Sequence, residues 1–274
     1  MQAIGIIGAG QMGAGIAQVS AQAGYNVFLS DVSVERAQAG KDGIAKIFGK
    51  LVAKEKLTQG DADAVLARIT PVGEYAPMSE AGLIIEAATE REDIKRMIFA
   101  EAGKVLASDA VLASNTSSIS ITRLGQVSPD PSRFIGIHFF NPVPLMKLVE
   151  VIRAADTAQW VVDAMVALGK RQTRVPVVVG DTPGFLVNLG GTAIGTEGLR
   201  IMQEGRATPS QVDAVMRDTC GFRMGPFELM DLTGIDVNFP ARKIIYEGFF
   251  HDRRMTPSPY HESLYAAGKL GRKT

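Results

Sequence analysis

The 274-residue chain has very little cysteine, tryptophan or histidine, and it has no excess of charge of either sign. Because Cys220 is the single cysteine, an internal disulfide and a cysteine-rich metal site are excluded, which favours a reducing compartment. The 29 basic and 29 acidic residues give a formal net charge of zero, so no overall field would attract nucleic acid or an anionic membrane. We therefore expect no nucleic-acid partner and no metal site, and any anionic ligand must be held by a local basic patch.

Long hydrophobic runs are also missing. No apolar segment approaches the roughly 20 residues of a membrane-spanning helix, and the first residues lack the basic and apolar segments of a signal peptide. Hydrophobic residues nevertheless make up 46% of the chain, which is enough for a substantial core. The sequence predicts a soluble, cytoplasmic protein without a membrane partner.

Short runs rich in Val, Ile and Phe alternate with longer amphipathic segments over the first two thirds of the chain. The runs predicted as strands are 4–7, 27–30, 83–87, 111–114, 134–138, 148–152 and 175–179. Helices predicted between them include 15–23, 34–53, 93–107 and 160–169. Several strands are too continuously apolar to have one solvated face, which is typical of a parallel sheet covered on both sides. The pattern predicts an α/β domain with a Rossmann-like, doubly wound sheet.

The pattern changes at G-D-T-P-G (180–184), after which no strand is predicted. The helices predicted there are 185–203, 209–219, 226–232 and 237–249. Thr208 is expected to cap the second of these, with Pro209 in its first turn. We therefore divide the chain into an α/β domain over 1–182 and an all-helical domain over 183–274.

The motif G-A-G-Q-M-G (8–13) follows the first predicted strand and opens the first helix. At this place Gly8 makes a tight turn, Gly10 lets a pyrophosphate approach the backbone, and Gly13 allows close packing of helix and strand. The helix N-terminus then offers free amides to the phosphates. Such a turn can also be purely structural, but its position at the start of the α/β alternation favours dinucleotide binding.

Asp31 ends the second predicted strand, 23 residues after Gly8. A carboxylate at this position can accept both ribose hydroxyls of NAD and would repel the 2′-phosphate of NADP. Alternatively, Asp31 is a helix N-terminal residue ahead of Ser33. Together with the glycine motif it predicts NAD as the cofactor.

A hydride-transfer enzyme acting on an alcohol needs a base for the hydroxyl proton and a group that orients this base. His251 and His261 lie in a polar, proline-containing stretch and are expected to be solvated. His138 instead closes an apolar strand, and ligands bind at the carboxyl ends of strands in such sheets. Glu150 lies in an otherwise apolar strand and needs a partner if it is buried. That partner is either His138 or a nearby cation such as Lys147.

The segment S-N-T-S-S (114–118) follows another short apolar strand. Its hydroxyls and amides are suited to contact a substrate, and they are equally suited to cap a helix that begins near Ser120. The residues alone leave both interpretations open.

These motifs together resemble the short-chain L-3-hydroxyacyl-CoA dehydrogenases, including the 3-hydroxybutyryl-CoA and 3-hydroxyadipyl-CoA dehydrogenases. The matching stretches are G-A-G-Q-M-G-A-G-I-A (8–17), I-E-A-A-T-E (85–90), S-N-T-S-S-I (114–119), G-I-H-F-F-N-P-V-P-L-M-K-L-V-E-V (136–151), T-P-G-F-L-V-N (182–188) and M-G-P-F-E-L-M-D (224–231). The resemblance covers essentially the whole chain, and the block around His138 is its most specific part.

By this resemblance His138 is the catalytic acid and base, and Glu150 orients it. The resemblance also implies that Ser117 and Asn188 bind the reacting oxygen of the substrate, with Asn141 in the same pocket. The residues that it places at the cofactor are Gly8, Gly10, Met12, Gly13, Asp31, Glu90, Lys95 and Asn115.

Lys54 is implied to approach the phosphates of coenzyme A. With Lys46 and Lys50 it stands at i, i+4 spacing, which predicts a basic stripe on one helix. Without the resemblance, a solvated surface face is the preferred interpretation of these lysines.

Three features depart from the family pattern. Leu189 follows Asn188 where the family usually has arginine, and Gly190 and Gly191 fall inside a predicted helix at a cost of roughly 1 kcal/mol each relative to alanine. The chain stops at G-R-K-T (271–274), where relatives continue into a glycine-phenylalanine-tyrosine tail. The residues leave open whether this end belongs to a truncated or trimmed form of a longer protein.

The resulting hypothesis is reversible, NAD-dependent oxidation of an L-3-hydroxyacyl-CoA to the 3-ketoacyl-CoA, in fatty acid metabolism or phenylacetate catabolism. The resemblance implies a homodimer, with residues 183–274 as the substrate and dimerisation domain. An alternative is a dehydrogenase of a free sugar acid such as gulonate, although only a coenzyme A ester needs the lysine stripe. A further alternative is a non-catalytic NAD-binding protein, against which the complete set of expected catalytic residues argues.

Overall fold

The computed structural model describes residues 2–274. An α/β unit ends at Asp181, and a helical unit begins at Thr182. The change therefore falls one residue before the boundary that the sequence pattern indicated. The alternation of strands and helices followed by helices alone confirms the predicted fold class.

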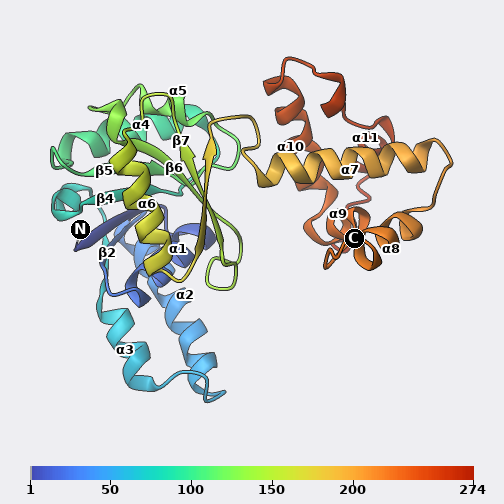
Figure 1. Ribbon diagram of the computed structural model, residues 1–274. Coiled ribbons are helices and arrows are strands. Elements are labelled where there is room, and N and C mark those ends of the chain that lie inside the picture. The colour runs from blue at the N-terminus through green and yellow to red at the C-terminus, as the bar shows by residue number, and fades with distance from the viewer. Residues whose placement is uncertain (1) are drawn as a thin grey trace. The chain divides into compact units, whose positions relative to one another are not determined.

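The α/β unit is built around one eight-stranded sheet (Figure 1). Its strands are β1 (Ala3–Ile7), β2 (Asn26–Ser30), β3 (Ile69–Val72), β4 (Leu83–Glu86), β5 (Val111–Ser114), β6 (Phe134–Phe139), β7 (Leu148–Arg153) and β8 (Val175–Gly180). They lie in the order β3-β2-β1-β4-β5-β6-β7-β8. Neighbouring strands run parallel except β6 and β7, which are antiparallel. The order reverses between β1 and β4, and ligands of such folds bind outside the carboxyl ends of the strands at this switch.

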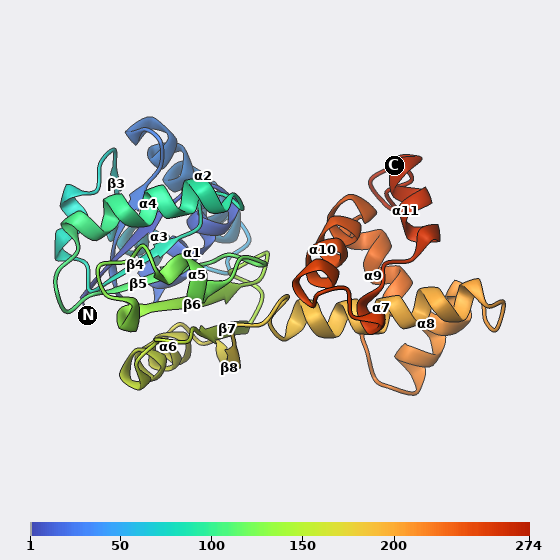
Figure 2. The same ribbon diagram turned by 90° about the horizontal axis from the view of Figure 1, so that it is seen from above.

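Helices cover both faces of the sheet, so its central strands are buried. The helices are α1 (Gln11–Gln22), α2 (Val34–Val52), α3 (Gln59–Ala67), α4 (Glu92–Val105), α5 (Ile121–Gly125) and α6 (Gln159–Arg171). Figure 2 shows α4 and α6 on opposite sides of the sheet. Every residue of β1, β4, β5 and β6 is buried, which explains why these strands are mostly apolar in sequence.

The strand β3 and the helix α3 were absent from the sequence prediction. β3 has four residues, includes Pro71, and lies at the end of the sheet. Proline cannot donate a ladder hydrogen bond, so within sheets it is confined to edge strands and similar places. Because a proline argues against a strand in sequence, this strand was not predicted. In α3 only Ala62 is buried, so this helix lacks the apolar periodicity that would reveal it.

The second unit contains helices and no strand among its described residues. Its α-helices are α7 (Val187–Gln203), α8 (Pro209–Asp218), α9 (Pro226–Thr233), α10 (Ile235–Gly248) and α11 (Pro259–Ala266). Thr208 caps α8 as predicted, and Gln211 completes a capping box. The helix α7 continues through Gly190 and Gly191, and a Cβ atom at either position would meet nothing within 4 Å.

The expected solvation of His261 was wrong. This residue lies on α11, which the sequence did not predict, and its side chain is 0% exposed. His251 is exposed, as expected.

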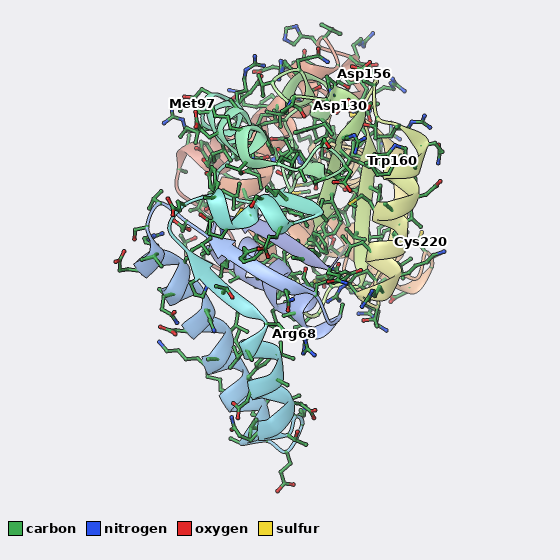
Figure 3. All side chains as sticks on the ribbon, turned by 90° about the vertical axis from the view of Figure 1, so that its left-hand side faces the viewer. Arg68, Met97, Asp130, Asp156, Trp160 and Cys220 are labelled. Carbon is green, nitrogen blue, oxygen red and sulfur yellow. The ribbon has the colours of Figure 1, made fainter. Side chains whose placement is uncertain are left out.

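The single tryptophan and the single cysteine of the chain lie at the surface. Trp160, at the start of α6, is half-exposed and carries the guanidinium of Arg133 5.2 Å from its ring centre. Cys220 is an exposed free thiol, and both residues are labelled in Figure 3. No helix within residues 2–274 is both long enough and apolar enough to span a bilayer.

The glycine turn provides a test of the packing between β1 and α1. A Cβ atom at Gly13 would lie 1.7 Å from the carbonyl oxygen of Gly8, which is backbone and cannot move aside cheaply. We expect Gly13→Ala to destabilise the protein by about 1–3 kcal/mol or more, measured as a lowered melting temperature. Gly49→Ala in α2 is the matched control, because nothing lies within 4 Å of its Cβ position. This control is expected to be neutral or stabilising by up to about 1 kcal/mol, and an equal loss in both variants would refute the packing role of Gly13.

Candidate active site

The turn between β1 and α1 keeps the start of α1 open. Gly8 has φ +99°, and a Cβ atom there would lie 2.6 Å from the backbone of Ala88, so the turn passes close to the segment after β4. Gly10 is the N-cap of α1, has no side-chain cap, and would place a Cβ atom within 4 Å of nothing. The first amides of a 12-residue helix therefore face an open space at the switch point. This geometry fits the pyrophosphate of a dinucleotide.

Asp31 joins the end of β2 to the glycine turn. Its carboxylate accepts hydrogen bonds from the backbone N–H of Ala9 at 2.7 Å and of Val32 at 2.8 Å. The guanidinium of Arg36 lies 3.5 Å from the same carboxylate. Ser33 caps α2 by accepting from the N–H of Arg36, so the capping role does not fall on Asp31.

A cavity of about 570 Å³ opens beside this turn. It is bounded by the glycine turn, by one face of α1 and one face of α2, and by the segment that follows β6. Its lining includes Gly10, Gln11, Asp31, Asn141 and Pro142. The cavity therefore connects the expected ribose site with the segment that leads away from His138.

His138 and Glu150 face each other across the antiparallel strands β6 and β7, where their Cα atoms are register partners. The ring Nδ1 of His138 lies 2.7 Å from Oε2 of Glu150. His138 is 6% exposed and Glu150 is 0% exposed. The sequence left open whether Glu150 pairs with His138 or with Lys147, and in the structure it pairs with His138. Because Nδ1–H donates to Glu150, the neutral ring keeps its acceptor at Nε2.

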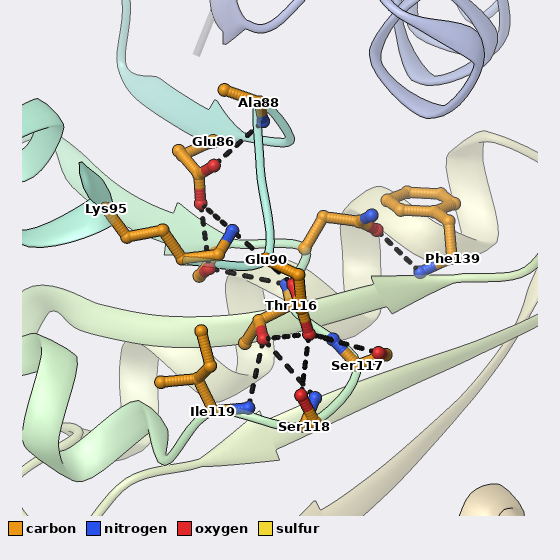
Figure 4. Close-up of polar contacts among 11 residues, drawn as sticks. Glu86, Ala88, Glu90, Lys95, Thr116, Ser117, Ser118, Ile119 and Phe139 are labelled. Atoms are coloured by element: carbon orange, nitrogen blue, oxygen red, sulfur yellow. Dashed lines mark hydrogen bonds and ion pairs between the residues drawn. The ribbon is translucent and has the colours of Figure 1, made fainter. Parts of the chain in front are cut away.

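Several polar groups of the 114–118 segment donate hydrogen bonds to Glu90 (Figure 4). The Oε1 atom of Glu90 accepts from the hydroxyls of Thr116 at 2.7 Å, Ser117 at 3.0 Å and Ser118 at 2.9 Å, and from the N–H of Ser117 at 2.8 Å. Burial acts to raise the pKa of Glu90, but these hydrogen bonds and the charge of Lys95 outweigh it and hold the pKa below its usual value. Glu90 is therefore ionised at neutral pH and orders the segment.

Ser120 performs the capping that the sequence left open for this segment. It accepts from the N–H of Arg123 at the start of α5. Asn115 does something else: its Oδ1 accepts from the N–H of Phe139 at 2.9 Å and ties the end of β5 to β6 (Figure 4). Asn115 thus helps to hold the end of the strand that carries His138.

Glu86 is a site residue that the sequence reasoning missed. Its side chain is 0% exposed, and its Oε2 lies 2.5 Å from Nζ of Lys95, which is 1% exposed. The same carboxylate accepts from the hydroxyl of Ser114 at 3.1 Å and from the N–H of Ala88 at 2.8 Å (Figure 4). Nζ of Lys95 is also 3.9 Å from Glu90. The signal was available, because Glu86 interrupts an apolar strand in the same way as Glu150.

The remaining expected residues come from several elements. Met12 lies in the first turn of α1 and packs against the core, and Asn188 lies on α7 of the second unit. Lys46 and Lys50 lie on α2, but this helix ends at Val52. The predicted helical stripe was therefore wrong for Lys54, which lies in the turn after the helix. The next residue, Glu55, has a positive φ of 55°.

Comparison with known proteins identifies one family for the whole chain. A family model for the NAD binding domain of 3-hydroxyacyl-CoA dehydrogenase matches residues 3–182, and the model for its C-terminal domain matches residues 184–274. The 3-hydroxyadipyl-CoA dehydrogenase of Escherichia coli K12 is 40% identical over 274 residues, which are 100% of this chain. The chain spans 58% of the length of that relative.

Two further relatives are matched over nearly their whole length. The 3-hydroxybutyryl-CoA dehydrogenase of Bradyrhizobium diazoefficiens is 40% identical, over 99% of this chain and 92% of its own. The crystal structure of (S)-3-hydroxybutyryl-CoA dehydrogenase from Ralstonia eutropha superposes with a TM-score of 0.95 at 39% identity, covering 100% of this chain and 96% of the other.

The buried pair of Glu86 and Lys95 makes a prediction about stability. Glu86→Gln removes the nearer carboxylate of the buried ammonium of Lys95 and leaves it the more distant Glu90, at 3.9 Å, so we expect a loss of about 3–5 kcal/mol in the free energy of unfolding. Replacing both partners, as Glu86→Gln with Lys95→Met, removes the buried ammonium and is expected to restore much of this loss. Urea unfolding of the single and double variants measures both effects, and a double variant no more stable than Glu86→Gln would contradict the pairing argument.

Proposed function

Because the chain belongs to the 3-hydroxyacyl-CoA dehydrogenase family, we propose that it oxidises the 3-hydroxyl of an L-3-hydroxyacyl-CoA with NAD, reversibly. The observation that carries this proposal is the pair of His138 and Glu150, buried at the end of an apolar strand and joined at 2.7 Å. The open start of α1 and the carboxylate of Asp31 fit NAD, the cofactor of the family.

His138 is proposed as the acid and base. With Nδ1–H donated to Glu150, the Nε2 atom accepts the proton of the substrate hydroxyl. NAD, when bound, supplies the acceptor for the hydride that leaves C3. The charge of Glu150 favours the imidazolium that forms on His138, because the pair lies in a buried region where little water screens it. In the reverse direction His138 returns the proton.

The other residues are proposed to bind and position. Ser117 and Asn188 would hydrogen-bond the reacting oxygen, and Asn141 would line the same pocket. Glu90 accepts from both the N–H and the hydroxyl of Ser117, which fixes the position of this residue. Lys54 would contact the phosphates of coenzyme A.

A second group is proposed to hold NAD. Asp31 would bind the adenosine ribose, while Gly8, Gly10, Met12 and Gly13 would surround the pyrophosphate. On the nicotinamide side we propose Glu90, Lys95 and Asn115. The ion pair with Glu86 supports this placement, since it fixes the ammonium of Lys95 near Glu90.

The biological setting is also a proposal. Relatives at 37% identity are named fatty acid oxidation complex subunit alpha, which supports a role in fatty acid oxidation. A role in phenylacetate breakdown and a homodimeric state built by residues 183–274 are proposals from the resemblance. A cytoplasmic location is a proposal from the composition of the sequence. Relatives named for butyryl and adipyl thioesters are equally similar, at 40% identity, so the acyl chain requires measurement.

The catalytic pair makes a prediction about turnover. We expect His138→Gln to lower kcat by several orders of magnitude while NAD binding, measured by calorimetry, persists. Glu150→Gln should lower kcat by about 10²–10⁴-fold through loss of the tautomer and of the stabilising charge. His251→Gln removes an exposed histidine and is the control. Turnover of His138→Gln equal to that of this control would refute the assignment.

The substrate class makes a separate prediction. NADH formation is followed with the L-3-hydroxy forms of butyryl-CoA, a longer straight-chain acyl-CoA and adipyl-CoA, with L-gulonate as the comparison. We expect turnover of thioesters and none of gulonate. Activity with gulonate alone would support the sugar-acid alternative, and NAD binding without turnover of any substrate would support a non-catalytic protein.

A further inference from the structure

The cavity beside the glycine turn is lined by three charged side chains. They are Asp31, directly after β2, and Glu35 and Arg36 in the first turn of α2. Within residues 2–274 no other charged side chain lines this cavity. A hydrogen bond with Ser33 holds the pKa of Glu35 below its usual value, so this carboxylate is ionised at neutral pH. Two carboxylates against one guanidinium leave this corner of the cavity with an excess of negative charge.

Arg36 is held next to Asp31 by charge and not by packing. Its Nε atom lies 3.5 Å from Oδ1 of Asp31, and the side chain of Arg36 is 70% exposed while that of Asp31 is 14% exposed. The carboxylate of Asp31 is fixed, because it accepts from the N–H groups of Ala9 at 2.7 Å and Val32 at 2.8 Å. An ion pair with one exposed partner is weak. The guanidinium can therefore turn from the carboxylate to a ligand, while the carboxylate stays in place.

The proposed function places the adenosine ribose of NAD at Asp31, and the next step rests on that placement. A ribose that donates its hydroxyls to this carboxylate brings its 2′ position within reach of Arg36, because the guanidinium lies only 3.5 Å from the same carboxylate. In NADP the 2′ position carries a phosphate. The carboxylates of Asp31 and Glu35 repel this group, whereas a guanidinium binds it with two parallel N–H bonds.

We propose that Arg36 is a specificity-determining residue of the cofactor site. It gives the protein a measurable affinity for NADP, and the charge of Asp31 keeps this affinity below that for NAD. Without the charge of Asp31, one carboxylate stands against one guanidinium, and Arg36 is released from its partner. The glycine turn does not distinguish the two dinucleotides, because the pyrophosphate that it would meet is common to both. The choice between NAD and NADP thus depends on a single carboxylate and the arginine beside it.

The first experiment measures dinucleotide binding without any turnover. NADH is titrated into the full-length protein by its fluorescence, and NADPH is titrated in the same way and in competition with NADH. The proteins compared are the wild type, Asp31→Asn, Arg36→Gln and the double variant. Asparagine keeps an oxygen that can accept from the N–H of Ala9, so Asp31→Asn removes the charge with little change of shape.

The charges predict four distinct results. The wild-type protein should bind NADH at least about tenfold more tightly than NADPH, and Asp31→Asn should lower this preference at least about tenfold by gaining affinity for NADPH. The double variant should lose that gain. Arg36→Gln alone should weaken NADPH binding several-fold and leave NADH binding nearly unchanged. High salt should reduce the NADPH affinity of Asp31→Asn, since an exposed guanidinium is screened.

A matched control separates the site from general effects of charge. Arg206→Gln removes an arginine whose side chain is 73% exposed and paired with Glu204 at 2.6 Å, and this arginine does not line the cavity. It should bind both dinucleotides as the wild-type protein does. Arg36→Gln changes an exposed side chain and is expected to fold normally, so it tests the role of Arg36 even if Asp31→Asn lowers the melting temperature too far for titration.

Several outcomes would overturn the proposal. One is a wild-type protein that binds NADH but not NADPH, and another is Arg36→Gln binding NADPH as tightly as Arg206→Gln does. A gain in NADPH affinity that survives in the double variant would show that Arg36 is not its source. Each of these outcomes would leave Arg36 as a solvated surface residue.

Turnover separates the role of Arg36 from the proposed reaction. The ratio of kcat/KM for NAD to that for NADP is measured with L-3-hydroxybutyryl-CoA in the wild-type protein and in Arg36→Gln, and it should rise several-fold in the variant. If no thioester is oxidised with either dinucleotide, the proposed reaction fails, and the titrations still decide the role of Arg36. If NAD supports turnover and Arg36→Gln alters neither the affinities nor this ratio, the proposed reaction stands and the role of Arg36 is refuted.

Discussion

The hydrogen bond between His138 and Glu150 is the interaction on which the proposed chemistry depends. It requires β7 to run back along β6, the one antiparallel pair that the sheet shows within residues 2–274. This reversal places a carboxylate 12 residues later directly opposite the histidine. The parallel strands meanwhile deliver the glycine turn and the 114–118 segment to the same edge of the sheet. One change of strand direction thus joins the base to the cofactor end of the fold.

Buried charge is handled differently in the two units. In the α/β unit Glu86 and Glu150 are both fully buried. Each has a partner that offsets the cost of removing its charge from water: Lys95 for Glu86 and His138 for Glu150. In the helical unit Arg242 is buried, and within residues 2–274 its Nη1 atom has no hydrogen-bond partner. The same physical rule therefore explains why each of the two buried carboxylates lies against a partner.

Much of the fold follows from local pattern. The continuous apolar strands, the glycine turn after β1 and the cap at Thr208 were readable because each leaves a signal within a few residues. Elements with weak local signals were missed. The edge strand β3 contains Pro71, and the short helix α11 begins at Pro259 among polar residues, so the complete burial of His261 could not be read from its neighbours.

The sequence by itself determined the fold class, the dinucleotide turn and the residue types available for chemistry, because these depend on composition and on periodicity along the chain. Only the tertiary structure decided which charges meet. It placed Glu150 on His138 rather than on Lys147, and it brought Lys95 to Glu86. It also laid Arg242 over Gly195, 47 residues earlier in the chain. Strand register and helix packing set these contacts, and both arise from burial across the whole unit, which no local pattern encodes.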